Sequence, residues 1–240
     1  MIDVLRGLEH AHSQGILHRD IKPANILIGP TLEGKLSDFG LAVPVGLNLK
    51  ALGAKEYVYA LHRAPEVHQG KPHTKASDIY ACGVTLYRLV NGDSFFSPPA
   101  PDELEELTVQ GRFPDRSRYR DFVPLSFRRV INRALSIDPS DRFPSAAHMR
   151  RTLEQVTIEK NWSEKILANG LQWTCGWRNK CYEVTRVQGS DEKWTVTVKK
   201  GSSKKVLRRV ARLCQDGLSR TEAEQRSRRV LQDFVLGKLK

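Results

Sequence analysis

A short hairpin with polar groups at both ends constrains this chain more than any other part of its sequence. The apolar run 26–28 predicts a strand, and residues 35–37 predict the strand that returns beside it after a turn. Four polar side chains stand just before the first strand and just after the second: Asp20, Lys22, Asn25 and Asp38. An antiparallel pair brings those two positions to the same end of the hairpin. We therefore expect two carboxylates, an amide and an ammonium group to lie close together.

Such a set of groups fits phosphoryl transfer from a metal-bound nucleotide. That reaction needs a carboxylate to receive the proton of the acceptor hydroxyl, a cation near the migrating phosphoryl group and hard oxygen ligands for Mg²⁺. Asp20 is the candidate base, and Lys22 is the candidate cation. Asn25 and Asp38 are the candidate ligands for the metal and for the nucleotide that it carries.

Ordered motifs add a family resemblance. The sequences HRDIKPAN at 18–25 and SDFG at 37–40 resemble the catalytic loop and the metal loop of the eukaryotic-type serine/threonine protein kinases. Residues 64–66, Ala-Pro-Glu, and the apolar helix predicted at 77–92 resemble later motifs of that family, in the same order. The resemblance covers residues 1–155. It implies the mainly α C-terminal lobe of the protein kinase-like fold, with ATP and Mg²⁺ as cofactors and a Ser or Thr hydroxyl of a protein substrate as acceptor.

The resemblance also assigns structural roles to single residues. Asp78 is expected to hold the backbone of the catalytic loop, and Arg142 is expected to pair with Glu66. His18 and Phe39 are expected to join an apolar stack behind the site. Arg19 matches the family's arginine that meets a charge on the activation loop, and the resemblance implies the same role here.

The N-terminal lobe of the family has no counterpart in the sequence. The chain opens inside the helix that precedes residue 18, and it contains neither a GxGxxG loop nor a VAIK lysine. We therefore expect residues 1–240 alone to be weak or inactive as an enzyme. An upstream start, a lobe supplied in trans by a second chain and a repurposed remnant are the three explanations, and the first is favoured. The alternative from another class is a non-catalytic kinase-like scaffold or basic module that binds a protein or a nucleic acid.

The expected activation loop, residues 40–66, contains no Ser or Thr, and its phenolic hydroxyls are those of Tyr57 and Tyr59. Tyr59 stands where the family pattern GTxxYxAPE has its Thr, and His62 stands where the pattern has its Tyr. Activation by phosphorylation of Ser or Thr in this loop is therefore excluded, whereas tyrosine modification stays open.

Charge divides the chain near residue 155. Residues 1–155 carry 20 Lys and Arg against 18 Asp and Glu, whereas residues 156–240 carry 19 against 9. All four tryptophans also lie beyond residue 160. We therefore expect a kinase-like domain at 1–155 and a separate basic module at 156–240. The sequence has no long apolar run or secretory signal, which predicts a cytoplasmic protein without membrane contact.

The basic module is predicted to be a small α+β unit of ββαα order. Residues 181–187 and 193–200 alternate with a period of two and predict a hairpin. Residues 203–214 have apolar groups at helical spacing and predict a basic helix that Gly217 ends. Ser219 and Glu222 predict a capping box for the last helix. The cations of 199–212 give two alternative partners, a nucleic acid or an acidic protein surface.

Overall fold

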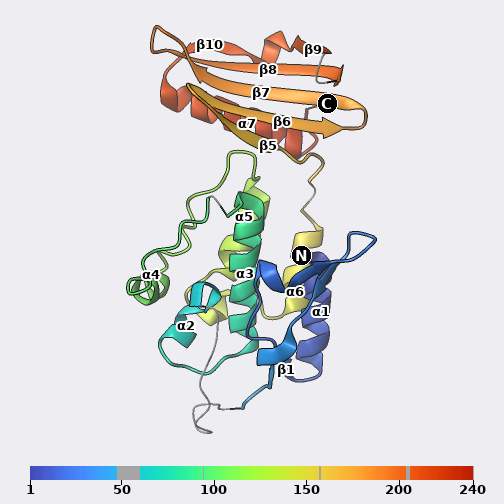
Figure 1. The fold of residues 1–240 in the computed structure, drawn as a ribbon, viewed down its shortest axis with the longest axis vertical. Coiled ribbons are helices and arrows are strands. Elements are labelled where there is room, and N and C mark those ends of the chain that lie inside the picture. The colour runs from blue at the N-terminus through green and yellow to red at the C-terminus, as the bar shows by residue number, and fades with distance from the viewer. Residues whose placement is uncertain (48–59, 94, 157, 204–205, 240) are drawn as a thin grey trace. The chain divides into compact units, whose positions relative to one another are not determined.

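The computed structural model describes residues 1–47, 60–93, 95–156, 158–203 and 206–239. Contacts divide the chain into two compact units, residues 1–120 with 125–156, and residues 121–124 with 157–240 (Figure 1). The predicted activation-loop tyrosines, Tyr57 and Tyr59, lie outside the described residues.

The first unit is built mainly from helices. In its described residues the α-helices are α1 (Ile2–Ser13), α2 (Pro65–His68), α3 (Lys75–Asn91), α4 (Leu104–Val109), α5 (Leu125–Ala134) and α6 (Ala146–Glu154). Four short 3₁₀ turns connect them with the strands: η1 (Pro23–Asn25), η2 (Phe39–Leu41), η3 (Ala60–His62) and η4 (Pro139–Asp141).

Two small antiparallel ladders complete this unit. β1 (Ile16–Leu17) pairs with β4 (Val43–Pro44), and β2 (Ile26–Ile28) pairs with β3 (Gly34–Leu36). Ile26 stands opposite Leu36, and Ile28 stands opposite Gly34. The predicted hairpin is confirmed, with the four polar residues of interest at its open end.

Helix α3 runs through the middle of the first unit (Figure 1). Thr74 and Ser77 form a capping box at its start, and most of the side chains of α3 are buried. Gly83 allows α5 to approach closely, because a Cβ at that position would lie 2.9 Å from the Cβ of Ala134. The helix therefore forms the centre on which the other parts of the unit pack.

A buried ion pair joins the first turn of α2 to the segment before α6. Arg142 donates from Nη1 and Nη2 to the two carboxylate oxygens of Glu66, at 2.8 and 2.7 Å. The guanidinium also donates to the carbonyls of Ser136, Ala76 and Ile137. The predicted pairing of Arg142 with Glu66 is confirmed, and the pair is fully hydrogen-bonded although it lies out of water.

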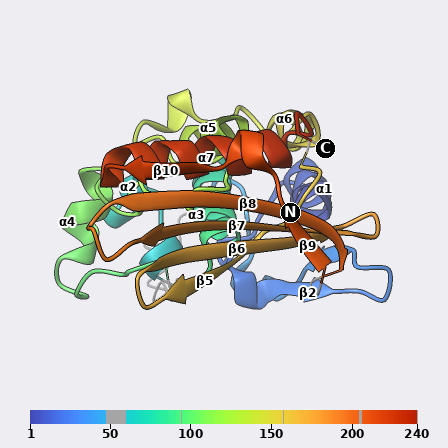
Figure 2. The same ribbon diagram turned by 90° about the horizontal axis from the view of Figure 1, so that it is seen from above.

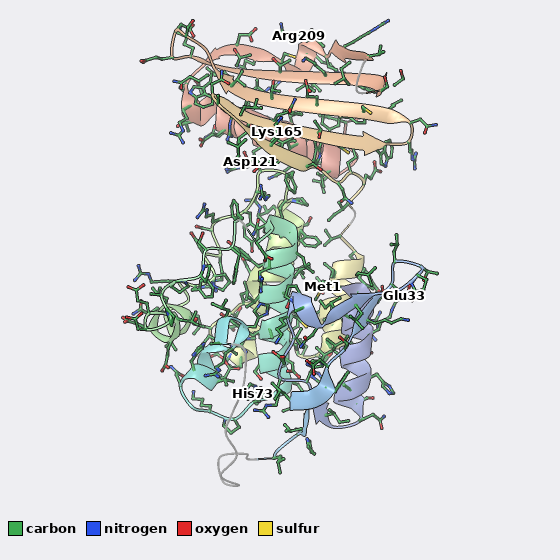
Figure 3. The ribbon with its side chains drawn as sticks, in the orientation of Figure 1. Met1, Glu33, His73, Asp121, Lys165 and Arg209 are labelled. Atoms are coloured by element: carbon green, nitrogen blue, oxygen red, sulfur yellow. The ribbon has the colours of Figure 1, made fainter. Side chains whose placement is uncertain are left out.

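In its described residues the second unit is a six-stranded antiparallel sheet with one α-helix on its face. Its strands are β5 (Ser163–Leu167), β6 (Gly170–Trp177), β7 (Lys180–Gln188), β8 (Trp194–Ser203), β9 (Val206–Arg209) and β10 (Gln215–Leu218), and a 3₁₀ turn, η5 (Ala211–Leu213), precedes β10. The strand order is β10, β8, β7, β6, β5, and β9 pairs with the other end of β8. Lys165 on β5 and Arg209 on β9 therefore mark opposite edges of the sheet (Figure 3).

Helix α7 (Arg220–Val235) covers one face of this sheet (Figure 2). The predicted capping box is confirmed, because Ser219 and Glu222 each bond the backbone N–H of the other. The apolar side chains of α7 share one core with the inward side chains of the sheet: Trp173, Tyr182, Val184, Val196, Val198, Ala223, Val230, Leu231, Phe234 and Val235. The predicted hairpin and the predicted apolar face of the last helix are therefore both confirmed.

The predicted ββαα order is wrong. Residues 203–214 do not form a basic helix within their described part, because Val206–Arg209 is strand β9 and Ala211–Leu213 is a single 3₁₀ turn. Gly217, expected at the end of a helix, lies in β10 with φ of 72°. The unpaired edge of β8 takes β9 and β10 as partners, and backbone pairing outweighs the helical spacing of a few apolar residues.

Residues 121–124 belong to the second unit although their sequence neighbours belong to the first. Asp121 explains this grouping, because its carboxylate pairs with Arg186 and Arg228, each at 3.0 Å. Gln232 also donates to the Asp121 carbonyl. The sequence did not predict this clamp, since its partners lie 65 to 111 residues away.

Within the described part of the chain, no helix combines the length and the apolar character that crossing a bilayer requires.

The buried ion pair gives a stability test. Replacing Arg142 by Met leaves the Glu66 carboxylate buried without its partner, so we expect the free energy of unfolding to fall by about 3–5 kcal/mol. Urea unfolding followed by the helical circular dichroism signal measures this change. Arg6→Met is the matched control, because the pairs of Arg6 with Asp3 and Glu154 are exposed and should contribute less than about 1 kcal/mol. Equal losses in the two variants would contradict the role given to Arg142.

Candidate functional site

The loop between β1 and β2 is held by one buried carboxylate. Asp78, in the first turn of α3, is 1% exposed and accepts the backbone N–H groups of His18 and Arg19, both at 2.9 Å. It also lies 2.9 Å from Nε2 of His12, on α1. The role predicted for Asp78 is confirmed, and α1, α3 and the loop meet at this single side chain.

The anchored loop has a conformation that side chains rarely adopt. Arg19 has φ of 69°, in the left-handed region, where a residue other than Gly is strained. Asp78 accepts hydrogen bonds from the backbone N–H groups of Arg19 and of the preceding residue, His18. These two bonds oppose relaxation of that strain. The loop therefore presents Asp20 in a fixed direction.

Three of the four predicted site residues touch one another. Nζ of Lys22 lies 2.6 Å from Oδ2 of Asp20, and Nδ2 of Asn25 lies 2.9 Å from the same oxygen. The same Asn25 nitrogen donates to the Asp20 carbonyl at 2.8 Å. Asp20 and Asn25 are buried, and Lys22 is one-quarter exposed. Oδ1 of Asp20 makes no hydrogen bond to any described residue, so that oxygen is left for a ligand.

Asp38, the fourth residue, is linked to the other three through His18. The backbone N–H of Asp20 donates to Nδ1 of His18, and Nε2 of the same ring lies 3.1 Å from the carbonyl of Ser37. A neutral imidazole with its proton on Nε2 satisfies both contacts. One buried ring therefore connects the backbone of Asp20 with the residue just before Asp38. The Phe39 ring packs on it with the centroids 4.6 Å apart, which confirms the predicted stack.

The charge state of His18 fits this bridging role. Burial lowers the pKa of His18, although the carboxylates of Asp78, Asp20 and Asp38 and the Ser37 carbonyl act in the opposite direction. The lowered pKa keeps the ring neutral at pH 7, as the two hydrogen bonds require.

Asp38 and Asn25 have the chemistry of a magnesium site that a nucleotide completes. Asp38 is exposed, with φ of 62°, and among the described residues its carboxylate is bonded only by the N–H of Gly40, to Oδ1 at 3.3 Å. Asn25 donates through its nitrogen, which leaves Oδ1 of its amide as a ligand. Among the described residues no group of three or more His, Cys, Asp or Glu side chains could hold a metal alone. Mg²⁺ fits such a sparse site, because it keeps waters and takes phosphate oxygens as its remaining ligands.

A second anchor of the catalytic loop was not identified from the sequence. His62 is buried, and its Nδ1 lies 2.9 Å from the carbonyl of Ile21. Thr85 of α3 also donates to that carbonyl, at 3.4 Å, and Nη1 of Arg88 lies 3.1 Å from Nε2 of His62. In the sequence His62 stands out only as a replacement of the family's Tyr. In the structure it joins the residue after Asp20 to α3.

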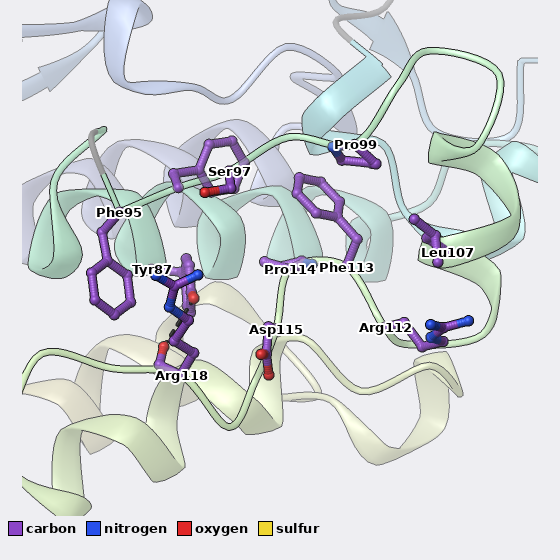
Figure 4. A pocket seen from close by; sticks show the side chains of 11 residues that line it. Tyr87, Phe95, Ser97, Pro99, Leu107, Arg112, Phe113, Pro114, Asp115 and Arg118 are labelled. Carbon is purple, nitrogen blue, oxygen red and sulfur yellow. Dashed lines mark hydrogen bonds between the residues drawn. The ribbon is translucent and has the colours of Figure 1, made fainter.

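A pocket elsewhere in the first unit contains none of the four site residues. It is lined mainly by Tyr87, Phe95, Phe96, Phe113 and Arg118, from the end of α3 and the loops that flank α4 (Figure 4). The hydroxyl of Tyr87 donates to the Arg118 carbonyl, and the Arg118 guanidinium stacks on Phe95 at 4.6 Å. Its volume of about 150 Å³ is below what a nucleotide needs. The pocket is a gap in aromatic packing rather than a candidate nucleotide site.

Comparisons with known proteins give a family for this chain. The family described as protein kinase domain matches residues 1–153. A probable serine/threonine-protein kinase of Corynebacterium efficiens is 37% identical over 163 residues, which are 65% of this chain and 25% of that protein. An Aurora kinase of Eremothecium gossypii is 36% identical over 157 residues, 64% of this chain and 39% of that protein. The serine/threonine-protein kinase PrkC of Bacillus subtilis is 31% identical over 170 residues, 69% and 26% of the two chains. The aligned part thus spans 25% to 39% of these relatives.

The second anchor predicts how stability depends on pH. Burial, with the nearby Arg88 charge, lowers the pKa of His62 from 6.5 to about 4. Between these values the unfolded chain binds a proton at His62 that the folded chain does not bind, so stability falls as the pH falls from about 6.5 toward 4, by about 3 kcal/mol at most. Urea unfolding at several pH values measures the slope, and His62→Gln should reduce it.

The exposed His10 supplies the control for this measurement. His10→Gln should leave the slope as it is in the unmodified chain. A His62→Gln chain that loses stability with acid as steeply as the unmodified chain would contradict the buried, neutral state of His62.

Proposed function

This chain belongs to the protein kinase family, and we propose that residues 1–155 form the catalytic lobe of a serine/threonine kinase that transfers the γ-phosphate of ATP to a protein hydroxyl. The observation that carries the proposal is the geometry of Asp20. Its Oδ2 is held by Lys22 and Asn25, and its Oδ1 is left for a hydroxyl group. The matched relatives that carry serine/threonine kinase names support the choice of acceptor.

In this mechanism Asp20 orients the acceptor hydroxyl and takes its proton through Oδ1. Lys22 has its ammonium 2.6 Å from the same carboxylate, so its charge lies where the γ-phosphate would meet the hydroxyl. There the charge would stabilise the negative charge that develops on the transferred group. Because Asp78, His18 and His62 fix the loop backbone, neither group has to be ordered during the reaction.

Asn25 and Asp38 would hold the magnesium ion that carries the nucleotide. When bound, Mg²⁺ neutralises the phosphate oxygens. The chain would contribute one amide oxygen just before β2 and one carboxylate just after β3, both at the open end of the hairpin, which sets the place of the triphosphate relative to Asp20. The use of ATP also favours the cytoplasmic location that the sequence predicts.

Apolar side chains are exposed beside the site, where a further lobe could pack on them. Leu27 and Ile28 of β2 are 57% and 67% exposed, and Phe39, which packs on His18, is 44% exposed. We propose that an N-terminal lobe, encoded upstream or supplied in trans, packs over these side chains and closes the nucleotide site. Without that cover the site is wet, and electrostatic catalysis is weaker in water. Residues 1–240 alone would then bind ATP weakly and transfer phosphate slowly.

The test compares residues 1–240 alone with the same residues joined to the N-terminal lobe of PrkC. The joined chain should phosphorylate a generic protein substrate at least about 100-fold faster than residues 1–240 alone. In the joined chain Asp20→Asn should lower the rate by about 100-fold to 10,000-fold, because the base is lost. Radiolabel transfer from ATP to Ser and Thr measures both effects.

Asp102→Asn is the matched control, because Asp102 is an exposed carboxylate far along the sequence from the loop. It should keep the rate of the unmodified joined chain. Asp38→Asn should lose the rise in melting temperature that Mg²⁺ and ATP together give the joined chain, whereas Asp20→Asn should retain it. An Asp20→Asn chain that transfers phosphate at the unmodified rate would refute the proposal.

A further inference from the structure

One end of the second unit's sheet contains a hollow surrounded by cations. It has a volume of about 470 Å³ and lies between the β6–β7 turn and the paired ends of β8 and β9. Its lining residues are Asn179, Lys180, Lys200, Gly201, Ser202, Arg208, Arg209 and Val210. Four of these eight residues are cationic, and none is acidic.

The cations converge because of strand register. Lys200 of β8 stands directly opposite Arg208 of β9, and Lys180 begins β7 on the other side of β8. Among the described residues, Lys180, Lys200 and Arg208 have no carboxylate within ion-pair distance. Lys199, the neighbour of Lys200, faces the other side of the sheet, where it pairs with Glu183 at 2.9 Å. Arg209 pairs with the exposed Asp216.

The crowding of positive charge acts on Lys200. Partial burial lowers the pKa of Lys200, and the charges of Lys180, Lys160 and Arg212 lower it further. Its ammonium lies 5.7 Å from the centre of the Tyr182 ring, a contact that compensates little of this repulsion. An anion placed among these side chains would relieve the repulsion, so the hollow is suited to a negatively charged ligand.

The shape of the hollow depends on a close backbone approach. A Cβ at Gly201 would lie 1.7 Å from the carbonyl oxygen of Val206, so β9 can approach β8 only because residue 201 is Gly. This approach brings Arg208 beside Lys200. The outer edge of β9 pairs with no described strand, and its backbone N–H and C=O groups are therefore open to an extended chain.

We propose that this hollow binds the phosphate group of a phosphorylated serine or threonine in an extended polypeptide that pairs with the edge of β9. A compact cluster of Lys and Arg around one hollow matches a single phosphate dianion. A nucleic acid backbone would instead need cations spaced along a track. The open edge of β9 favours a polypeptide, because a strand edge recognises main-chain groups. The choice of phosphoserine or phosphothreonine rests on the proposed function, since these are the products of that reaction.

The experiment measures binding to residues 1–240 without ATP. The probe is a fluorescein-labelled 11-residue peptide of Ala and Gly with one central phosphoserine, and its unphosphorylated twin and single-stranded dT20 are compared with it by anisotropy. We expect the phosphopeptide to bind at least 10-fold more tightly than the twin and than dT20. The double variant K200Q/R208Q should weaken this binding at least 10-fold.

K165Q/K193Q is the matched control, because it removes two exposed lysines that do not line the hollow. It should bind the phosphopeptide as the unmodified chain does, and melting curves show that both variants fold. Equal binding of the twin, tighter binding of dT20, no binding, or unchanged binding by K200Q/R208Q would each overturn the proposal. Because the peptide is already phosphorylated, a catalytically inactive chain does not affect this test.

Discussion

The buried carboxylate of Asp78 is the interaction on which the catalytic unit depends. It accepts two consecutive backbone N–H groups of the loop and contacts His12, so α1, α3 and the loop share one anchor. A buried carboxylate costs free energy unless its oxygens are hydrogen-bonded, and here the loop supplies the donors. The same bonds hold Arg19 in a strained conformation and fix the direction of the neighbouring Asp20. His18 then sets the position of Asp38 relative to Asp20.

The two units use their charged side chains in different ways. In the first unit the buried guanidinium of Arg142 is hydrogen-bonded to Glu66 and to three backbone carbonyls. In the second unit an apolar core between α7 and the sheet provides the stability, and the cations stand at one end of the sheet. There register, rather than a dedicated network, brings Lys200 and Arg208 together. Satisfied charges fix a geometry, whereas uncompensated charges favour a ligand.

Much of the first unit could be predicted from its sequence, because its signals are local or carried by family motifs. The hairpin, the Asp78 anchor and the Arg142 pair are of this kind. His62 escaped prediction because it stands where the family pattern has Tyr, so the resemblance gives it no role, and its contact with the Ile21 carbonyl is not local in sequence. In the second unit the prediction of a helix at 203–214 is wrong, because apolar residues at helical spacing do not exclude a strand. The open edge of β8 and the lack of a Cβ at Gly201 favour strand β9 over a helix. Neither can be recognised from the sequence of this one segment.

The central claim is that Asn25 and Asp38 hold a metal-bound nucleotide beside Asp20. Paramagnetic broadening by Mn²⁺, a substitute for Mg²⁺, measures this most directly in the amide spectrum of the chain joined to an N-terminal lobe and supplied with ATP. The account predicts strong broadening for residues around Asn25 and Asp38, with loss of that broadening in Asp38→Asn. Broadening centred elsewhere, or unchanged in the variant, would contradict it.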